Sequence, residues 1–360
     1  MPESSSSFSA ESYFATQPPP PGLEHDIEGV KEFVRRQQEK GRNIVLVTSG
    51  GTTVPLELNV AYGQLRPSVR FLDNFSAGTR GATSAEYFLK AGYAVLFMHR
   101  QFSLQPFSRH YSHSTNPFLD FLEIEPGVEE RSSFTASGAG SKGSQICVTL
   151  DKRETLLEVL TVYKAVHAAG TLHTLTFVTV NDYLWLLRAV SQELSVMKRK
   201  AMYYLAAAVS DFFLPRQKMA KHKIQSGKGS LHIEMDQVPK ILKPMVDNWT
   251  GKDGFVVSFK LETDPALLIP KAETSLQRYG HQVVIGNDLN RRKFEVVFIS
   301  WKDALPSSSI DTADSSSSFA ESWLRIDPYD HNKEIEEDIV AELVKRHEMW
   351  IAGGTTSIKP

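Results

Sequence analysis

The 360-residue sequence predicts an α/β protein with a mostly parallel, doubly wound (Rossmann-like) sheet and helices on both faces of that sheet. Strand-like and helix-like segments alternate along the chain, and the strand-like segments are short, continuous apolar runs. Four of these runs lead directly into small or polar residues, in TSGGT, AAAVSD, SFKLETD and GNDL. Because such sheets bind ligands beyond the carboxyl ends of their strands, this edge is expected to form the binding site.

The first strand–helix–strand unit sets the direction of the sheet. Residues 25–40 have apolar residues at helical spacing, and residues 44–47 form a buried strand that ends at a pair of glycines. Residues 82–91 form a helix that Gly92 stops, and residues 93–100 form a second buried strand. This order predicts a right-handed parallel unit.

The rest of the chain continues this alternation. Pro270 lies inside one expected helix and can kink it. Helices are expected at residues 150–170, 182–194, 265–280 and 333–351, and strands within residues 172–180, 202–212, 255–264, 281–289 and 294–300.

One domain accounts for most of the chain. A single α/β domain is expected over residues 25–350, with a short C-terminal tail at residues 351–360. Residues 1–24 are rich in Ser and Pro and are expected to be a disordered tail. Residues 125–146 are poor in apolar side chains and residues 304–320 are rich in Ser, so both are expected to be loop insertions.

Composition excludes several classes of protein. The formal net charge of -2 lacks the basic excess of a dedicated nucleic-acid surface. No apolar run reaches the roughly 18 residues of a membrane span, and the N-terminus lacks the pattern of a secretory signal. Cys147 is the single cysteine, so no intrachain disulfide can form, as is usual in a reducing compartment. We therefore expect a cytoplasmic protein that binds neither nucleic acid nor membranes.

Two glycine-containing segments can bind phosphate. The turn TSGGT can bring backbone amides close to an anion, although an ordinary tight turn has the same composition. In DNFSAGTRG, Ser76, Gly78 and Gly81 lie at the start of a helix, where free amides and the helix dipole favour an anion. The alternative is a helix start capped by Ser76 or Thr79, but a simple cap does not require Asn74, two glycines and two arginines, Arg80 and the upstream Arg70, together.

Two other segments offer charged or small residues near strand ends. YLAAAVSDF places three alanines where a ligand can lie against the backbone, followed by Asp211; the alternatives are close helix packing and a helix N-cap. KMAKHKIQSGKGSLHIEM contains Lys218, Lys221 and Lys223, which form either a solvated surface or a flap over a polyphosphate.

Other chemistries lack their motifs. The sequence contains no spacing typical of structural zinc and no GxSxG nucleophile turn. Cys147 lies in a segment without an obvious activating partner, so a catalytic thiol is not expected. No metal ligands can be named from the sequence.

Together, these segments resemble one family. VTSGGTTVPLE, RFLDNFSAGTRGATSAEYFLKAGY, YLAAAVSDFFLP, HKIQS, VSFKLETDP and the Asn of VVIGNDL occur in this order and resemble phosphopantothenate–cysteine ligase in its stand-alone eukaryotic form. The resemblance runs from about residue 27 to about residue 348. The departures fall in LNVAYGQLRPS and in the two insertions, which leaves the conformations of these loops unpredictable.

The resemblance implies a reaction in coenzyme A biosynthesis. A nucleoside triphosphate and 4'-phosphopantothenate form an acyl-nucleotide and pyrophosphate, and the amine of L-cysteine then attacks the acyl carbon to give an amide and a nucleoside monophosphate. Bacterial relatives use CTP and are fused to a decarboxylase, whereas the eukaryotic type typically uses ATP. The resemblance also implies Mg²⁺, a homodimer, and other enzymes of the pathway as candidate partners.

The resemblance further implies roles for named residues. Asn74, Asp211 and Lys223 would act in catalysis, with Lys223 on a flap. Arg70 would reach the phosphate of phosphopantothenate from the adjacent subunit. The nucleotide would be bound by Gly50, Ser76, Gly78, Gly81, Phe259 and Asn287. Phosphopantothenate would be bound by Asn74, Ala207, Ala208 and Asp211.

Two other functions compete with a ligase. A nucleotide-binding protein that has lost catalysis is disfavoured by Asn74, Asp211 and Lys223. A Rossmann dehydrogenase is disfavoured because no GxGxxG follows a strand and no acidic residue lies at the expected later strand end.

Overall fold

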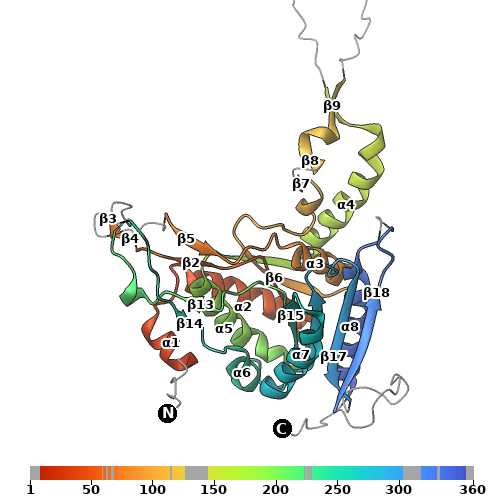
Figure 1. The fold of residues 1–360 in the computed structure, drawn as a ribbon. Helices are drawn as coiled ribbons and strands as arrows, with labels where there is room; N and C mark the ends of the chain where they lie inside the picture. The colour runs from red at the N-terminus through yellow and green to blue at the C-terminus, as the bar shows by residue number, and fades with distance from the viewer. Residues whose placement is uncertain are drawn as a thin grey trace, which may run out of the picture.

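The computed structural model describes residues 9–58, 60–61, 64–65, 69–113, 116–125, 145–222, 224, 229–302, 318–330 and 333–353. Its centre is an eight-stranded sheet with the order β11-β6-β1-β12-β15-β16-β17-β18 (Figure 1). The strands are β1 (Ile44–Ser49), β6 (Ala94–Arg100), β11 (Leu172–Phe177), β12 (Ala201–Leu205), β15 (Phe255–Glu262), β16 (Val283–Asp288), β17 (Glu295–Trp301) and β18 (Phe319–Arg325).

Six strands of this sheet run parallel, from β11 to β16. The last two, β17 and β18, pair antiparallel at one edge. Parallel strands place all their carboxyl ends at one edge of the sheet, so the polar segments that follow β1, β12, β15 and β16 meet there. The predicted α/β fold class is confirmed.

Helices cover both faces of the sheet. Alternate side chains of β1 point to opposite faces, because Ile44 and Leu46 belong to one buried cluster and Val45 and Val47 to the other. One face carries α2 (Leu23–Glu39), α5 (Val180–Leu194) and α7 (Pro265–Tyr279), and the other carries α3 (Thr79–Lys90) and α8 (Ile335–Ala352).

An arm and several short elements lie outside the central sheet. The arm, which we define as β9 (Leu122–Glu125), β10 (Gln145–Val148) and most of α4 (Leu150–Ala169), projects from the body (Figure 1). The short strands are β2 (Thr53–Pro55), β3 (Val60–Ala61), β4 (Gln64–Leu65), β5 (Phe71–Asp73), β7 (Ser112–His113), β8 (Asn116–Pro117), β13 (Phe212–Phe213) and β14 (Asp236–Gln237). The short helices are α6 (Leu242–Pro244), a π-helical turn (Met245–Trp249) and 3₁₀ turns at Ser108–His110, Phe118–Phe121, Ser195–Lys200 and Arg216–Lys218. None of the described helices has both the length and the apolar character needed to cross a bilayer.

The expectation of a disordered tail over residues 1–24 is wrong for residues 9–24. Residues Ala10–Thr16 form helix α1, which Ser9 caps, and the side chain of Tyr13 is fully buried. The Tyr13 hydroxyl donates to Asn181 Oδ1 at 3.1 Å, and Trp185 Nε1 donates to the Gln17 carbonyl at 3.2 Å. Composition suggested disorder because Ser and Pro dominate, but the few aromatic side chains are sufficient to anchor the segment on α5. Residues 1–8 lie outside the described part.

The two expected insertions have ordered ends. Leu122–Glu125 and Gln145–Val148 pair antiparallel as β9 and β10, and residues 126–144 between them lie outside the described residues. The expected 304–320 insertion overlaps the start of β18, whose Phe319 ring packs 4.7 Å from that of Trp301. The start of this edge strand was not predicted because it follows directly on a Ser-rich stretch. Helix α8 continues to Ala352, slightly past the expected domain end.

Candidate active site

The turn after β1 lies against the loop that precedes α3. Gly50 has a φ of +82°, which L side chains rarely adopt. A Cβ on Gly51 would lie 1.8 Å from the carbonyl oxygen of Asn74, so a side chain at this position would displace the loop. The Asn74 amide also donates to the Thr52 carbonyl at 3.1 Å. The structure therefore brings together the two glycine-containing segments that were predicted to bind phosphate.

The N-terminus of α3 has no side-chain cap. Gly78 is its N-cap residue, with a φ of +85°. Ser49 Oγ donates to the Gly78 carbonyl at 3.0 Å, and a Cβ on Gly81 would lie 2.4 Å from that hydroxyl. Ser76 Oγ accepts from the Gly78 amide at 3.4 Å and not from the first turn of the helix. Ser76 thus satisfies the N-cap amide, but no side chain caps the first turn of α3, so the amides of that turn stay a candidate anion site.

Ser103 also borders this turn, although no motif in the sequence marks it. A Cβ on Gly50 would lie 3.1 Å from Ser103 Oγ, and a Cβ on Gly78 would lie 3.3 Å from the same atom. Ser103 reaches this position because the loop after β6 folds back, and its Leu104 amide donates to the Ala77 carbonyl at 2.9 Å. Such a long-range placement leaves no local pattern in the sequence.

Phe259 and Asn287 lie on the α3 side of the sheet. Phe259, in β15, packs edge-on against Tyr204 with 5.0 Å between ring centroids, and the Tyr204 hydroxyl lies 2.8 Å from Ser84 Oγ of α3. Asn287, at the end of β16, is buried, and its Oδ1 accepts from Arg80 in the first turn of α3 at 3.3 Å. Both residues are thus connected to the helix whose N-terminus is the candidate anion site.

The alanine segment after β12 bonds to the glycine turn. The Ala207 amide donates to Thr48 Oγ1 at 3.1 Å, and the Ala208 amide donates to the Gly50 carbonyl at 2.8 Å. Asp211 follows with an exposed side chain and is not the N-cap of any described helix, so the N-cap alternative is wrong. Its carbonyl accepts from the Val238 amide at 2.9 Å, which fixes the backbone below the carboxylate.

A cleft of about 260 Å³ opens beside this segment, between α5 and α7. It combines apolar residues of α5 and β12 with the charged residues Asp211, Lys240 and Lys260, and Ala207 and Phe259 also line it. Asn74, Ala208 and Arg70 do not line it. The cleft therefore contains only part of the predicted phosphopantothenate site.

Arg70 lies beside β5 and pairs with a buried carboxylate of its own chain. Its NH1 is 3.5 Å from Oε2 of Glu57, whose side chain is fully buried, while the Arg70 side chain is 37% exposed. Glu57 also accepts from the amides of Ile224 at 2.9 Å and Val69 at 3.3 Å. Burial acts to raise the pKa of Glu57, but these amides and Arg70 outweigh it and lower the pKa.

The predicted flap is described at its base and at part of its length. Strands β13 and β14 pair antiparallel at the base, and Lys218 donates to Asp236 at 2.7 Å. The Leu58 amide donates to the Ala220 carbonyl at 2.8 Å, so the segment also contacts the chain after β2. Lys223 lies outside the described residues, and its catalytic role stays a prediction.

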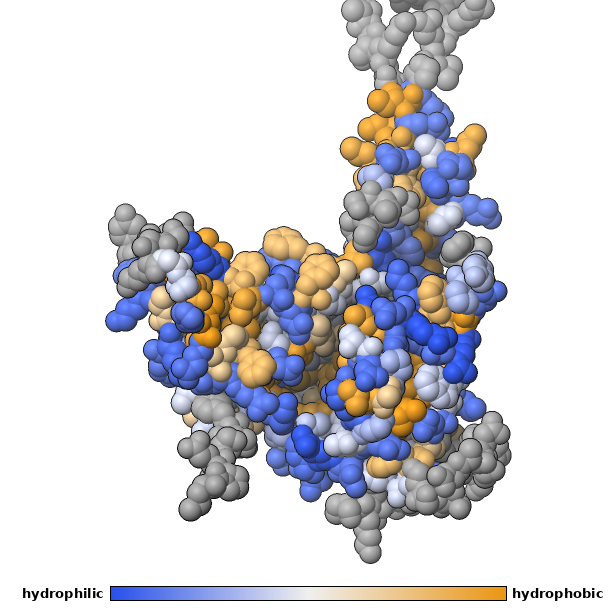
Figure 2. All heavy atoms as spheres, in the orientation of Figure 1, coloured by the Kyte–Doolittle hydropathy of each residue, from blue (hydrophilic) through white to orange (hydrophobic). Residues whose placement is uncertain are grey.

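Exposed apolar side chains gather around β5 and near the arm. Around β5, Val69, Phe71, Leu72 and Phe75 are all exposed, next to Arg70. On the arm, exposed side chains include Ile124, Ile146, Leu150 and Leu157, and Figure 2 shows apolar groups along it. Exposed apolar groups gathered in this way are typical of protein contact surfaces.

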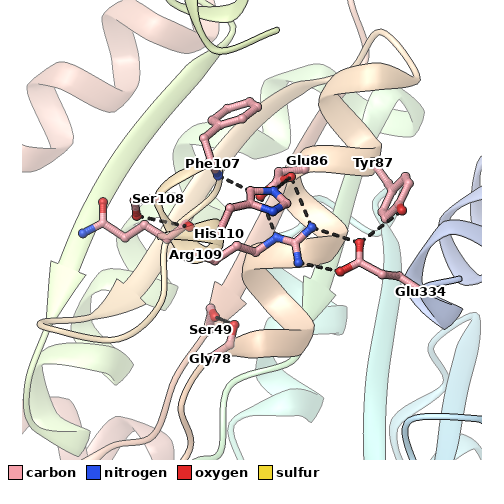
Figure 3. Close-up of polar contacts among 10 residues, drawn as sticks. Ser49, Gly78, Glu86, Tyr87, Phe107, Ser108, Arg109, His110 and Glu334 are labelled. Atoms are coloured by element: carbon pink, nitrogen blue, oxygen red, sulfur yellow. Dashed lines mark hydrogen bonds and ion pairs between the residues drawn. The ribbon is translucent and has the colours of Figure 1, made fainter. Parts of the chain in front are cut away.

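A charged cluster fixes α3 against the loop after β6 and the N-terminus of α8 (Figure 3). The buried Glu86 accepts from Arg109 Nε at 2.7 Å, from the Phe107 amide at 2.7 Å and from His110 Nε2 at 3.0 Å. Arg109 also donates to both carboxylate oxygens of Glu334, at 2.6 and 2.9 Å. Burial acts to raise the pKa of Glu86, but the hydrogen bonds from His110 and Arg109 lower it to about 2.

The described residues contain no cluster of three or more His, Cys, Asp or Glu side chains that could hold a metal ion. A protein-built metal centre is thus absent from the described part. Mg²⁺ in nucleotide enzymes is commonly held by substrate phosphates with one or two carboxylates, so such an ion needs no cluster built by the protein alone.

The geometry defines a class of protein: a Rossmann-like α/β protein with a candidate phosphate site at the carboxyl edge of its sheet. Residues 133–304 match the family described as DNA/pantothenate metabolism flavoprotein C-terminal domain. The human phosphopantothenate–cysteine ligase is 43% identical over 93% of this chain and 96% of its own length. The ligase CAB2 of Saccharomyces cerevisiae is 39% identical over 97% of this chain and 88% of its own length.

A solved structure shares both fold and sequence with this chain. A mutant of Cab2 in complex with phosphopantothenate-cysteine superposes with a TM-score of 0.76 at 39% identity, and covers 95% of this chain and 98% of that one. The chain belongs to the phosphopantothenate–cysteine ligase family.

Proposed function

We propose that this ligase joins 4'-phosphopantothenate to L-cysteine with ATP as the activating nucleotide, through an acyl-adenylate, releasing pyrophosphate and AMP. The observation that carries the proposal is the uncapped N-terminus of α3, packed against the glycine turn after β1. Free amides in this arrangement suit a polyphosphate, because they offer several donors with no opposing side chain. The human and yeast relatives carry the ligase name, which supports the same reaction here.

The residues of the chain have distinct tasks in this proposal. Amides near Gly50 and Gly78 hold the phosphates, and the Asn74 side chain orients the carboxylate of phosphopantothenate toward the α-phosphate. The two lysines of the cleft, Lys240 and Lys260, offset the negative charge of the substrates bound near Asp211. The proton that the cysteine amine loses needs an acceptor, and Asp211 is the carboxylate of the cleft.

Magnesium would arrive with the nucleotide. The nucleotide phosphates would hold it, since the described residues form no metal cluster of their own. When bound, Mg²⁺ shields the polyphosphate and stabilises charge on the pyrophosphate leaving group.

We further propose a homodimer with shared active sites, in the cytoplasm. Two surfaces support a dimer: the exposed apolar side chains around β5 and those of the arm. Arg70 lies within the first of these, and its side chain is partly exposed. A residue in that position can serve the phosphate of a substrate in the adjacent subunit.

Complementation tests the shared site. Mixing Arg70→Ala subunits with Asn74→Ala subunits should restore activity, because one site of each hybrid dimer then has both residues intact. Subunit exchange is verified by native mass spectrometry with differently labelled chains. If activity does not recover after verified exchange, the active sites are not shared. If the protein is a monomer at the assay concentration, the homodimer is contradicted.

Nucleotide choice is tested separately, by turnover with ATP and with CTP at matched concentrations. We expect a higher kcat/KM with ATP. A preference for CTP would show that the proposed nucleotide is wrong, but it would not contradict the ligase reaction.

A further inference from the structure

Arg80 is a cation at a position where a cation is unfavourable. It is the second residue of α3, beside the Gly78 N-cap. The positive end of the helix dipole lies here and disfavours a positive side chain. The first turn of α3 contains no acidic residue. A local rule broken at the edge of a binding site usually has a functional reason.

Three segments converge on the Arg80 guanidinium. Its NH1 lies 2.9 Å from Glu336 Oε1 in the first turn of α8. Its NH2 donates to Asn287 Oδ1 at 3.3 Å and to the Arg292 carbonyl in the loop after β16. The side chains of Arg80 and Glu336 are only 16% and 12% exposed, so solvent screens this pair little. The geometry therefore holds the guanidinium in one place.

Glu336 supplies the charge that offsets Arg80. Burial raises the pKa of Glu336, and Arg80 acts against that rise. A carboxylate at the N-terminus of α8 also meets the positive end of that helix dipole, so it is favourably placed. Arg80 therefore forms an ion pair with Glu336 through NH1 and donates a hydrogen bond to Asn287 through NH2.

The chemistry of arginine then fixes the orientation of the Asn287 amide. A guanidinium has donors only, so the oxygen of the Asn287 amide must face it. One proton of Nδ2 points to the Ile285 carbonyl at 3.3 Å. The other Nδ2 proton is thus the group that Asn287 offers, and it can meet only a hydrogen-bond acceptor.

We propose that Arg80 is a positioning residue of the nucleotide site: with Glu336 it holds Asn287 as a hydrogen-bond donor toward an acceptor oxygen or nitrogen of ATP. The inference rests on the proposed nucleotide role of Asn287. Without Arg80, the amide can turn over and present its oxygen to the same acceptor, which is repulsive. Arg80 itself need not touch the nucleotide.

The test compares Arg80→Met, Asn287→Ala and the double variant in the full-length ligase. Arg80→Met should raise the Kd for MgATP, measured by calorimetry without the other substrates, and the KM for ATP by about tenfold, the cost of losing one charge-supported orientation. The KM values for phosphopantothenate and cysteine should stay within about twofold, because neither substrate is expected to depend on Asn287. The double variant should bind MgATP no more weakly than Asn287→Ala, because Arg80 acts through that residue.

Arg346→Met is the matched control. Arg346 lies on α8, is buried and, like Arg80, pairs with a carboxylate, here Glu342 at 2.7 Å, but it contacts Ser300 in place of Asn287. It should lower the melting temperature without changing the Kd for MgATP. If Arg80→Met fails to fold, Glu336→Gln replaces it and should weaken MgATP binding about threefold, since the bridge keeps its shape but loses the charge.

The outcomes separate the two claims. If Asn287→Ala binds MgATP normally, the nucleotide role of Asn287 fails, and the inference on Arg80 fails with it. If Asn287→Ala is impaired while Arg80→Met binds MgATP like wild type, only the inference is overturned. Additive losses in the double variant, or an equal effect of Arg346→Met on the Kd, also overturn it, because Arg80 would then act on its own or through general stability.

Discussion

Replacing Glu86 by Gln should destabilise the protein in a pH-dependent way. Glu86 is 4% exposed and accepts hydrogen bonds from Arg109, His110 and the Phe107 amide. The gap between its pKa of about 2 and the ordinary value of 4.5 corresponds to about 3 kcal/mol of stability at neutral pH. Because the folded-state pKa is depressed, this stability is present above pH 4.5 and is lost as the pH falls toward 2.

The loss in free energy of unfolding for Glu86→Gln should stay close to about 3 kcal/mol. Gln keeps the shape of the side chain, and Arg109 retains both of its bonds to Glu334, so the guanidinium is not left without a charged partner. Because Glu86 lies on α3, the helix that carries Gly78 and Gly81, the variant should also raise the KM for ATP modestly.

Urea unfolding of wild type and Glu86→Gln at pH 7 and pH 3.5 is the assay. The difference in free energy of unfolding should be about 3 kcal/mol at pH 7 and about 2 kcal/mol at pH 3.5, where the wild-type advantage has begun to disappear. Glu32→Gln, which removes only an exposed ion pair with Arg35, should leave the midpoint unchanged. A difference below about 1 kcal/mol at pH 7, or one that does not shrink at low pH, refutes the reasoning.

Three further predictions concern other parts of the molecule. Tyr13→Ala should cost about 3 kcal/mol or more in urea unfolding, because it empties a fully buried site; an unchanged midpoint would restore the disordered-tail view of residues 9–24. Gly51→Ala should abolish most ligase activity in a protein that stays soluble, because its Cβ would lie 1.8 Å from the Asn74 carbonyl oxygen; near-normal kcat/KM would show that the turn adapts. Burial lowers the pKa of His347 to about 4, so the folded state binds fewer protons than the unfolded state and stability falls as the pH drops from 6.5 to 4. The destabilisation caused by His347→Gln should therefore be smaller at pH 5 than at pH 7, and equal values at both would contradict this account.

The sheet and its functional edge could be predicted from the sequence because their signals are local. Continuous apolar runs such as Ile44–Val47 mark strands that are buried on both faces, and the residues that follow them mark the carboxyl edge. The glycines of TSGGT and DNFSAGTRG also signal locally, since their positions need positive φ or close approach.

The parts that sequence reasoning missed depend on contacts between distant segments. Helix α1 is short, and it is ordered by packing against α5 and the Phe213 ring, 5.0 Å from that of Tyr13. Edge strand β18 has a largely exposed face and follows a Ser-rich stretch, so its burial signal is weak. Ser103 carries no motif of its own, and although Arg80 lies inside DNFSAGTRG, nothing local indicates its bond to Asn287, because each reaches the candidate site through a partner far away in the sequence.

A product assay with each substrate omitted in turn tests the central claim, that the site at the carboxyl edge activates phosphopantothenate with ATP and joins it to cysteine. Mass spectrometry of the complete mixture should show the amide of phosphopantothenate and cysteine, AMP and pyrophosphate in equal amounts. Pyrophosphate–ATP isotope exchange should need phosphopantothenate but not cysteine, and folded Asn74→Ala should lose both exchange and amide. Amide formed with ADP and phosphate, or normal exchange and normal amide in Asn74→Ala, would contradict the account.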